Sequence, residues 1–145
     1  MSYIRLAVLI GIVLFLMVIA VHDYKTMKIP NKFIIILTLM AVMSGFVFQE
    51  ISLMDRFWGI ILLAVPMGFL AMKGTFGGGD VKLIAVTGFI LGWKFNLFAF
   101  ILASMIGGIY ASFLLILRKK KRKDKFALGP FLCLGSIVSL IILYI

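Results

Sequence analysis

The sequence predicts an all-α membrane protein, a polytopic bundle of six transmembrane helices with the N and C termini outside. Three observations support this fold class. The 145 residues are 64% apolar with a mean hydropathy of +1.23, whereas a soluble domain is roughly 45–50% apolar. The charged residues gather between long apolar runs, and most runs approach the ~20 residues needed to cross a bilayer core. Because backbone polar groups must be satisfied within lipid, we expect these runs to be helices of one transmembrane domain, 1–145.

The predicted spans follow one another with only short polar breaks. They are 3–21, 33–48, 57–72, 81–93, 95–117 and 126–145. We interpret the first as a span and not as a cleaved signal peptide, because no small-x-small cleavage site follows it. Turn-forming residues separate several spans, as at Pro30-Asn31 and Gly129-Pro130. The fourth span is short, and at 1.5 Å per residue it covers only about 17–20 Å.

The distribution of Lys and Arg predicts the orientation. With six spans, the loops after the first, third and fifth spans lie on one side, and the Lys and Arg residues gather overwhelmingly on that side. The basic side is expected to be cytoplasmic, which makes this a multi-pass protein of the cell inner (cytoplasmic) membrane. We interpret the run from Arg118 to Lys125 as a topology determinant resting on anionic membrane lipids, and not as a nucleic-acid site.

Cofactor chemistry is not expected. Cys133 and His22 are the single cysteine and the single histidine of the chain. They provide neither a disulfide framework nor a cluster of ligands for a structural metal. The sequence therefore predicts no metal and no cofactor.

Two of the five acidic residues stand out by position. Asp23 and Asp80 each adjoin a predicted span on the cytoplasmic side, so they can meet although they are distant in sequence. An ionisable group near membrane depth is a candidate functional residue. Two adjacent carboxyl groups share a proton, so one acts as an acid and the other as a base that activates water. Helix dipoles favour Asp23 as the protonated member and Asp80 as the base.

A simpler alternative is that each aspartate caps a helix or pairs with a nearby lysine. Lys25, Lys28 and Lys82 lie close enough in sequence to be such partners.

The short fourth span suggests that its helix begins below the membrane surface. Gly77, Gly78 and Gly79 would then lie with Asp80 in a recessed, water-filled notch. Glycines in such a place allow positive backbone dihedrals and the close approach of another peptide segment.

The sequence around both aspartates resembles the type IV prepilin peptidases, which are GxGD membrane aspartic proteases. Asp23 is followed after seven positions by Pro30 and Asn31, and the second motif is Gly77-Gly78-Gly79-Asp80-Val81-Lys82-Leu83. A weaker third motif, Gly129-Pro130-Phe131-Leu132 with Gly135, opens the last span.

The resemblance implies an endopeptidase in which Asp23 and Asp80 are catalytic. It would remove the leader peptide from prepilin-like precursors of a type IV pilus or related filament at the cytoplasmic face. Pro30 and Asn31 are expected to stop the first helix and cap the second. Lys82 is expected to contact lipid phosphate or an acidic residue of the mature pilin.

The chain departs from the larger bacterial members of that family. Those members carry an additional N-terminal cytoplasmic region with cysteine pairs and also methylate the new amino terminus. With one cysteine here, the chain resembles the short, protease-only members, and we do not expect methyltransferase activity.

Two other functions remain open at the level of sequence. A small transporter or proton channel would use the aspartates as relay groups. A non-enzymatic assembly subunit would use them only to pair with lysines. The sequence determines neither the oligomeric state nor the filament system served.

Overall fold

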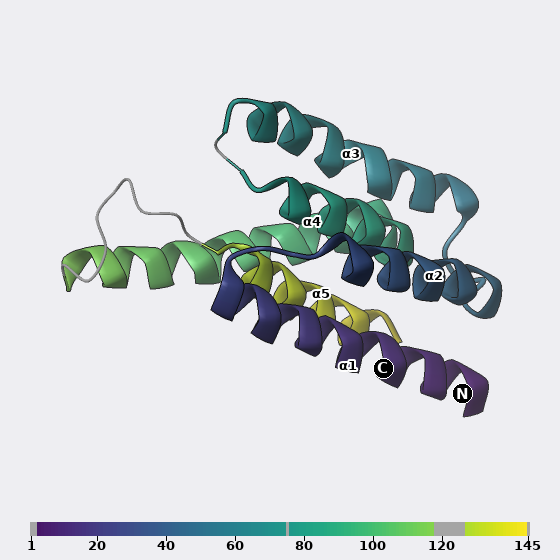
Figure 1. The fold of residues 1–145 in the computed structure, drawn as a ribbon. Helices are drawn as coiled ribbons and strands as arrows, with labels where there is room; N and C mark the ends of the chain where they lie inside the picture. Colours follow the sequence, from purple (N-terminus) through teal and green to yellow (C-terminus); the bar gives the residue numbers. More distant parts are fainter. Residues whose placement is uncertain (1–2, 75, 118–126, 145) are drawn as a thin grey trace.

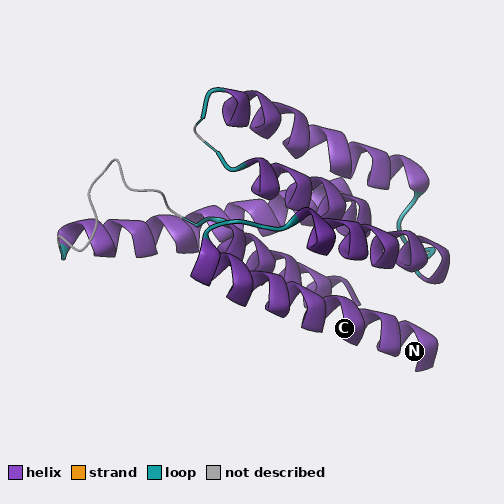
Figure 2. Ribbon diagram, viewed as in Figure 1, coloured by secondary structure: helices purple, strands orange, loops and turns teal. Residues whose placement is uncertain are grey.

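A computed structural model describes residues 3–74, 76–117 and 127–144. Within these ranges the secondary structure is helical, as predicted (Figure 2). The helices are α1 (Tyr3–Thr26), α2 (Asn31–Val47), α3 (Leu53–Met72), α4 (Gly78–Ile116) and α5 (Gly129–Tyr144). Every predicted span overlaps one of them, although residues 126 and 145 and the basic run 118–125 lie outside the described residues.

Three helices, α1, α3 and α4, are long and apolar enough to cross a membrane, and α2 and α5 are shorter apolar helices. The helices predicted separately over 81–93 and 95–117 both fall within the range of α4, which consists of two helices joined at a break. The break lies at Gly92, where the backbone has φ 71° and ψ 170°. Only glycine adopts such a positive φ readily.

The chain reverses direction at this break. The side-chain amide of Asn96 donates to the carbonyl of Ile84 at 3.3 Å and that of Gly59 at 3.0 Å. Twelve residues of straight helix would separate Asn96 from Ile84 by about 18 Å. The two halves of α4 therefore run side by side as a helical hairpin, and the buried Asn96 holds them together against α3.

At the turn of this hairpin, the buried guanidinium of Arg56 binds two backbone carbonyls. Arg56, only 1% exposed, donates to the carbonyls of Phe48 at 2.6 Å and Phe89 at 2.8 Å. Phe89 lies in the last turn before Gly92 and Phe48 caps the end of α2. Carbonyls at helix ends lack partners within the helix, so the guanidinium satisfies two of them.

α4 lies at the centre of the bundle. It packs against α2, α3 and α5, while α1 packs against α2 and α5. Glycines permit the closest approaches: a methyl group on Gly59 or Gly88 would overlap the backbone oxygen of the other, and one on Gly135 would overlap the carbonyl of Ala99. Small residues at helix crossings are typical of membrane bundles.

The alternating helix directions bring one set of helix ends together. The ends of α1 and α3 and the starts of α2, α4 and α5 gather at one end of the bundle, whereas the start of α1 and the end of α5 lie toward the other (Figure 1). The first end carries Asp23 and Asp80.

Candidate active site

Asp23 reaches the interior of the bundle because of its position on α1. The buried residues of this helix are Leu9, Ile12, Leu16, Ile19 and Asp23. Their spacing of three and four residues places them on one face, so the carboxyl group continues the face that packs inward. Asp23 is only 3% exposed, and its Oδ2 has no hydrogen-bond partner among the described residues. A buried polar atom without a partner is costly, which marks this position as a candidate functional site.

Asp80 lies in the first turn of α4, whose N-cap is Gly77. Its carboxylate occupies the space that two glycines leave free. A methyl group on Gly77 would lie 3.2 Å from Oδ2 of Asp80, and one on Gly129 would lie 3.2 Å from Oδ1.

Gly129 brings the two aspartates together. The methyl group that would lie 3.2 Å from Oδ1 of Asp80 would also overlap Oδ2 of Asp23. Oδ2 of Asp23 and Oδ1 of Asp80 therefore both lie within 3.2 Å of the position of this methyl group, and so within about twice that distance of each other. The predicted meeting of the two residues is found in the structure, at the first residue of α5.

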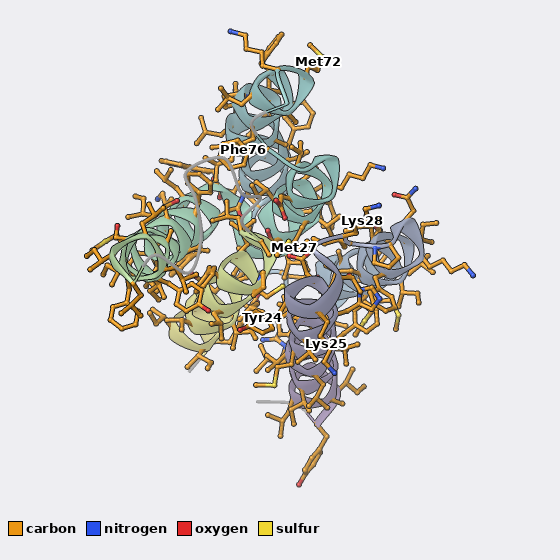
Figure 3. The ribbon with its side chains drawn as sticks, turned by 60° about the vertical axis from the view of Figure 1, so that its left-hand side comes forward. Tyr24, Lys25, Met27, Lys28, Met72 and Phe76 are labelled. Carbon is orange, nitrogen blue, oxygen red and sulfur yellow. The ribbon has the colours of Figure 1, made fainter. Side chains whose placement is uncertain are left out.

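A cleft of about 430 Å³ opens at this pair. Its lining includes Asp23, Asp80 and Gly77, Gly78 and Gly79, together with residues of the connections that precede α2 and α4. Met27 and Phe76 line it and lie toward the middle of this end of the bundle, while Met72 lies at its edge (Figure 3). The four residues of the predicted notch, 77–80, all line this cleft, and its depth below a membrane surface stays a prediction.

The role expected for the three glycines is only partly correct. Gly77 has φ −72°, and Gly78 and Gly79 start α4, so positive dihedrals are not needed there. The expected close approach does occur at Gly79, where a methyl group would lie 3.0 Å from Cβ of Ile29.

The lysine pairs of the simpler alternative are not found among the described residues. The one ion pair there joins Arg5 to Glu50, and no hydrogen bond links Asp23 or Asp80 to a lysine. Asp23 instead accepts a hydrogen bond from the backbone of Gly129 at the start of α5. The two carboxyl groups therefore face each other and the cleft without a cation bound to them.

The other motif residues, Pro30, Asn31 and Lys82, are not among the residues that line the cleft. Lys82 donates to Oδ1 of Asn31 at 2.9 Å, outside the residues that line the cleft. The prediction that Asn31 caps α2 is wrong, because Pro30 occupies the N-cap position and Asn31 begins the helix. The prediction that α1 stops before Pro30 is confirmed, since α1 ends at Thr26.

Other polar groups near the pair have separate partners. His22 contacts Thr26 through Nδ1 at 3.1 Å and packs edge-on against the Phe33 ring. In the part of the chain that the structure describes, no group of three His, Cys, Asp or Glu side chains is arranged to hold a metal ion.

Sequence reasoning did not place Gly129 in the site. It also considered the dipoles of only the two helices that carry the aspartates. The N-terminus of α5 lies against Asp23 as well, and it stabilises negative charge there. Both aspartates thus face a helix N-terminus, and dipoles no longer distinguish the proton-bearing member. The Gly129-Pro130 pair at a helix start was the available sequence signal.

Within the described residues, three helices long and apolar enough to cross a membrane, together with two aspartates at one cleft, indicate a helical membrane protein with a candidate acid–base site. The chain belongs to the type IV leader peptidase family, whose model matches residues 10–112. That range includes Asp23 and Asp80, whereas Gly129 follows it.

Two bacterial proteins that are similar in sequence to this chain carry the same name. The chain is 31% identical over 131 residues to the prepilin leader peptidase/N-methyltransferase of Bacillus subtilis (strain 168), covering 86% of this chain and 51% of the relative. It is 31% identical over 137 residues to the protein of the same name in Escherichia coli (strain K12), covering 87% and 59%. The chain thus spans about half the length of these relatives. No solved structure matches it significantly.

The names of these relatives combine peptidase with N-methyltransferase activity. The absence of methyl transfer in this chain therefore stays a prediction.

Proposed function

We propose that this chain is an intramembrane aspartic endopeptidase that cleaves the leader peptide from prepilin-like precursors. The observation that carries the proposal is the approach of Asp23 and Asp80 to one point beside Gly129, at the edge of an open cleft. Membership of the type IV leader peptidase family supports the substrate class.

In the proposed mechanism the carboxyl pair holds one proton. The ionised carboxylate removes a proton from water, and the water oxygen forms a bond to the carbonyl carbon of the scissile peptide. The protonated carboxyl gives its proton to the carbonyl oxygen, which yields a tetrahedral diol. Collapse breaks the carbon–nitrogen bond. The proton gained by the first carboxylate passes to the leaving amine nitrogen, and one hydroxyl of the diol returns its proton to the second carboxylate, which restores the singly protonated pair. The products are a carboxylate and a new amino terminus.

The proposed location is the cytoplasmic face of the cell inner membrane. Lys25, Lys28, Lys32, Lys73 and Lys82 belong to the helix ends and connections at the aspartate end of the bundle. Positively charged residues favour the cytoplasmic side, so we place the cleft there with six crossings and both termini outside. The partners are then the prepilin-like substrate and the surrounding membrane lipids.

The relay function of a transporter or proton channel has less support. In the described part of the chain, the two aspartates lie at one end of the bundle, and the buried polar side chains Thr87 and Asn96 further along α4 bond to each other and to backbone carbonyls. These bonds explain Thr87 and Asn96 as packing elements.

The test is the cleavage of a purified prepilin by the purified chain. Asp23→Asn and Asp80→Asn should each abolish the shortened product, because each removes one member of the acid–base pair. Asp55→Asn is the matched control. Asp55 accepts a hydrogen bond from Trp93 at 3.0 Å at the opposite end of the bundle, and its replacement should leave cleavage unchanged. Normal cleavage by a folded Asp23 or Asp80 variant would refute the mechanism.

A further inference from the structure

The first turn of α4 borders the candidate active-site cleft and carries two backbone N–H groups without a partner. Its N-cap is Gly77, which has no side chain to accept a hydrogen bond from this turn. The N–H of Asp80 bonds to the carbonyl of Gly77 at 3.1 Å. The N–H groups of Gly78 and Gly79 bond to no acceptor among the described residues. Such N–H groups point out of the helix end and attract an oxygen that carries negative charge.

Gly78 is the residue of this turn that a bound peptide can approach. It lines the cleft and is exposed, and a methyl group on it would meet no atom within 4 Å. A methyl group on Gly79 would instead lie 3.0 Å from Cβ of Ile29. The φ of Gly78 is not positive, so neither packing nor backbone conformation requires glycine there. Without a side chain, this position allows a ligand to come close to the N–H.

The two carboxyl groups border the same space. Oδ2 of Asp80 lies 3.2 Å from the position of a methyl group on Gly77, and the peptide bond from Gly77 to Gly78 carries the free N–H. Asp23 also lines the cleft, is 3% exposed, and its Oδ2 has no hydrogen-bond partner among the described residues. A buried acceptor of this kind needs a donor from a bound molecule. The cleft therefore offers acceptors for a water molecule beside a donor for an oxygen.

Peptide hydrolysis requires such a donor. When water adds to the carbonyl carbon, the electron pair of the carbon–oxygen double bond moves to the oxygen. Preorganised N–H groups that bind this oxygen stabilise the transition state. In the proposed mechanism the oxygen also receives the proton of the protonated carboxyl. A backbone N–H can bind another lone pair of the same oxygen and keeps its own proton throughout.

We propose that the backbone N–H of Gly78 donates a hydrogen bond to the carbonyl oxygen of the scissile peptide and stabilises the charge that develops there. The positive end of the α4 dipole strengthens this stabilisation. The inference rests on the proposed endopeptidase function and deepens it, because it adds a catalytic group of the main chain to the two aspartates.

Gly78→Pro tests the proposal, since it removes the N–H from a backbone that suits proline. Gly78 is the first residue of α4, where proline is favoured. Gly77 has φ −72° and ψ 135°, the extended conformation that a residue before proline adopts. In the full chain, kcat for a purified precursor should fall about 100-fold, the cost of losing one such donor, while KM changes little. Gly78→Ala keeps the N–H, and its kcat should exceed that of Gly78→Pro about tenfold or more.

Leu53→Pro is the matched control. Leu53 is the first residue of α3, is 79% exposed and follows Ser52, an N-cap with φ −65° and ψ 152°. The start of α3 lies at the end of the bundle opposite the aspartates (Figure 1), so this variant should cleave the precursor like the unmodified chain. A normal kcat of Gly78→Pro would overturn the proposal, and so would an equal loss of kcat in Gly78→Ala.

Two peptide inhibitors of one sequence separate the lost hydrogen bond from obstruction by the proline ring. One carries a difluoroketone at the scissile position, which hydrates to a diol and retains the oxygen. The other carries a reduced amide, which has no oxygen there. Gly78→Pro should bind the first about tenfold more weakly than the unmodified chain does and the second equally well. Equal weakening of both would overturn the proposal.

A semisynthetic chain covers misfolding of the proline variant. An ester replaces the peptide bond between Gly77 and Gly78, which removes the N–H without adding a ring. This chain should show a similar loss of kcat, and a normal kcat would overturn the proposal. Cleavage retained by a folded Asp80→Asn variant would instead refute the proposed function, while the comparison of the two inhibitors still tests the donor.

Discussion

Gly129→Ala should lower the proposed peptidase activity about 100-fold without removing either of the proposed catalytic aspartates. The added methyl group would overlap Oδ2 of Asp23, lie 2.9 Å from its Cγ and lie 3.2 Å from Oδ1 of Asp80. Ordinary contacts of a Cβ begin at 3.4 Å, so the Asp23 carboxylate must move by about 1 Å. A displacement of this size at a catalytic group reduces the rate about 100-fold. This corresponds to about 2.7 kcal/mol in the activation barrier.

The assay measures kcat/KM for a purified precursor together with thermal unfolding of the detergent-solubilised chain. Overpacking should lower the free energy of unfolding by about 1–3 kcal/mol, which leaves a folded protein at the assay temperature. Gly108→Ala is the control, because Gly108 lies inside α4, is exposed and has no atom within 4 Å of a methyl group there. It should keep full activity. Wild-type cleavage by folded Gly129→Ala would refute the argument that this glycine makes room for the aspartate pair.

Three further predictions concern stability, measured by thermal or denaturant unfolding. Gly88→Ala should lower the free energy of unfolding by about 1–3 kcal/mol or more, because its methyl group would overlap a backbone oxygen of α3. Gly68→Ala is the control and should not, since the nearest atom to its methyl group is 3.9 Å away; equal stability of the two variants would contradict the packing. Arg56→Met should lose about 2–4 kcal/mol because two buried carbonyls lose their donor, while Arg5→Met, which breaks an exposed ion pair, should lose less than about 1 kcal/mol. Met27→Gly should stabilise by about 1 kcal/mol, because Met27 has φ 52°; a destabilised variant would contradict this.

Hydropathy predicted the apolar segments well but not the ends of the helices. The first span was predicted to end at residue 21, whereas α1 continues to Thr26 and stops where Met27 adopts a positive φ. Hydropathy measures where the apolar residues end, and a helix continues through polar residues until the backbone changes conformation. The extra turn matters because it contains Asp23.

The hairpin at Gly92 was less visible in the sequence. The predicted boundary lay at Trp93 and Lys94, where the polarity changes, but the reversal occurs at the preceding glycine. Arg56 likewise precedes the predicted span 57–72 but is buried within α3. Both features depend on partners distant in sequence, such as the carbonyl of Phe89, which no local pattern identifies.

The meeting of Asp23 and Asp80 was predictable because the charge distribution placed both on one side of the bundle. The contribution of α5 was not, since Gly129 follows Asp80 by 49 positions and acts only through the space it leaves free.

The central claim is geometric, and proximity of positions 23 and 80 tests it most directly. Cysteines replace Asp23 and Asp80 in a Cys133→Ala background, a short bifunctional thiol reagent is added to membranes, and the chain is cut at a protease site inserted between α2 and α3. The account predicts that the two halves stay joined for positions 23 and 80 and separate for positions 23 and 55. Separation of the halves in the first pair, with joining in the second, would contradict it.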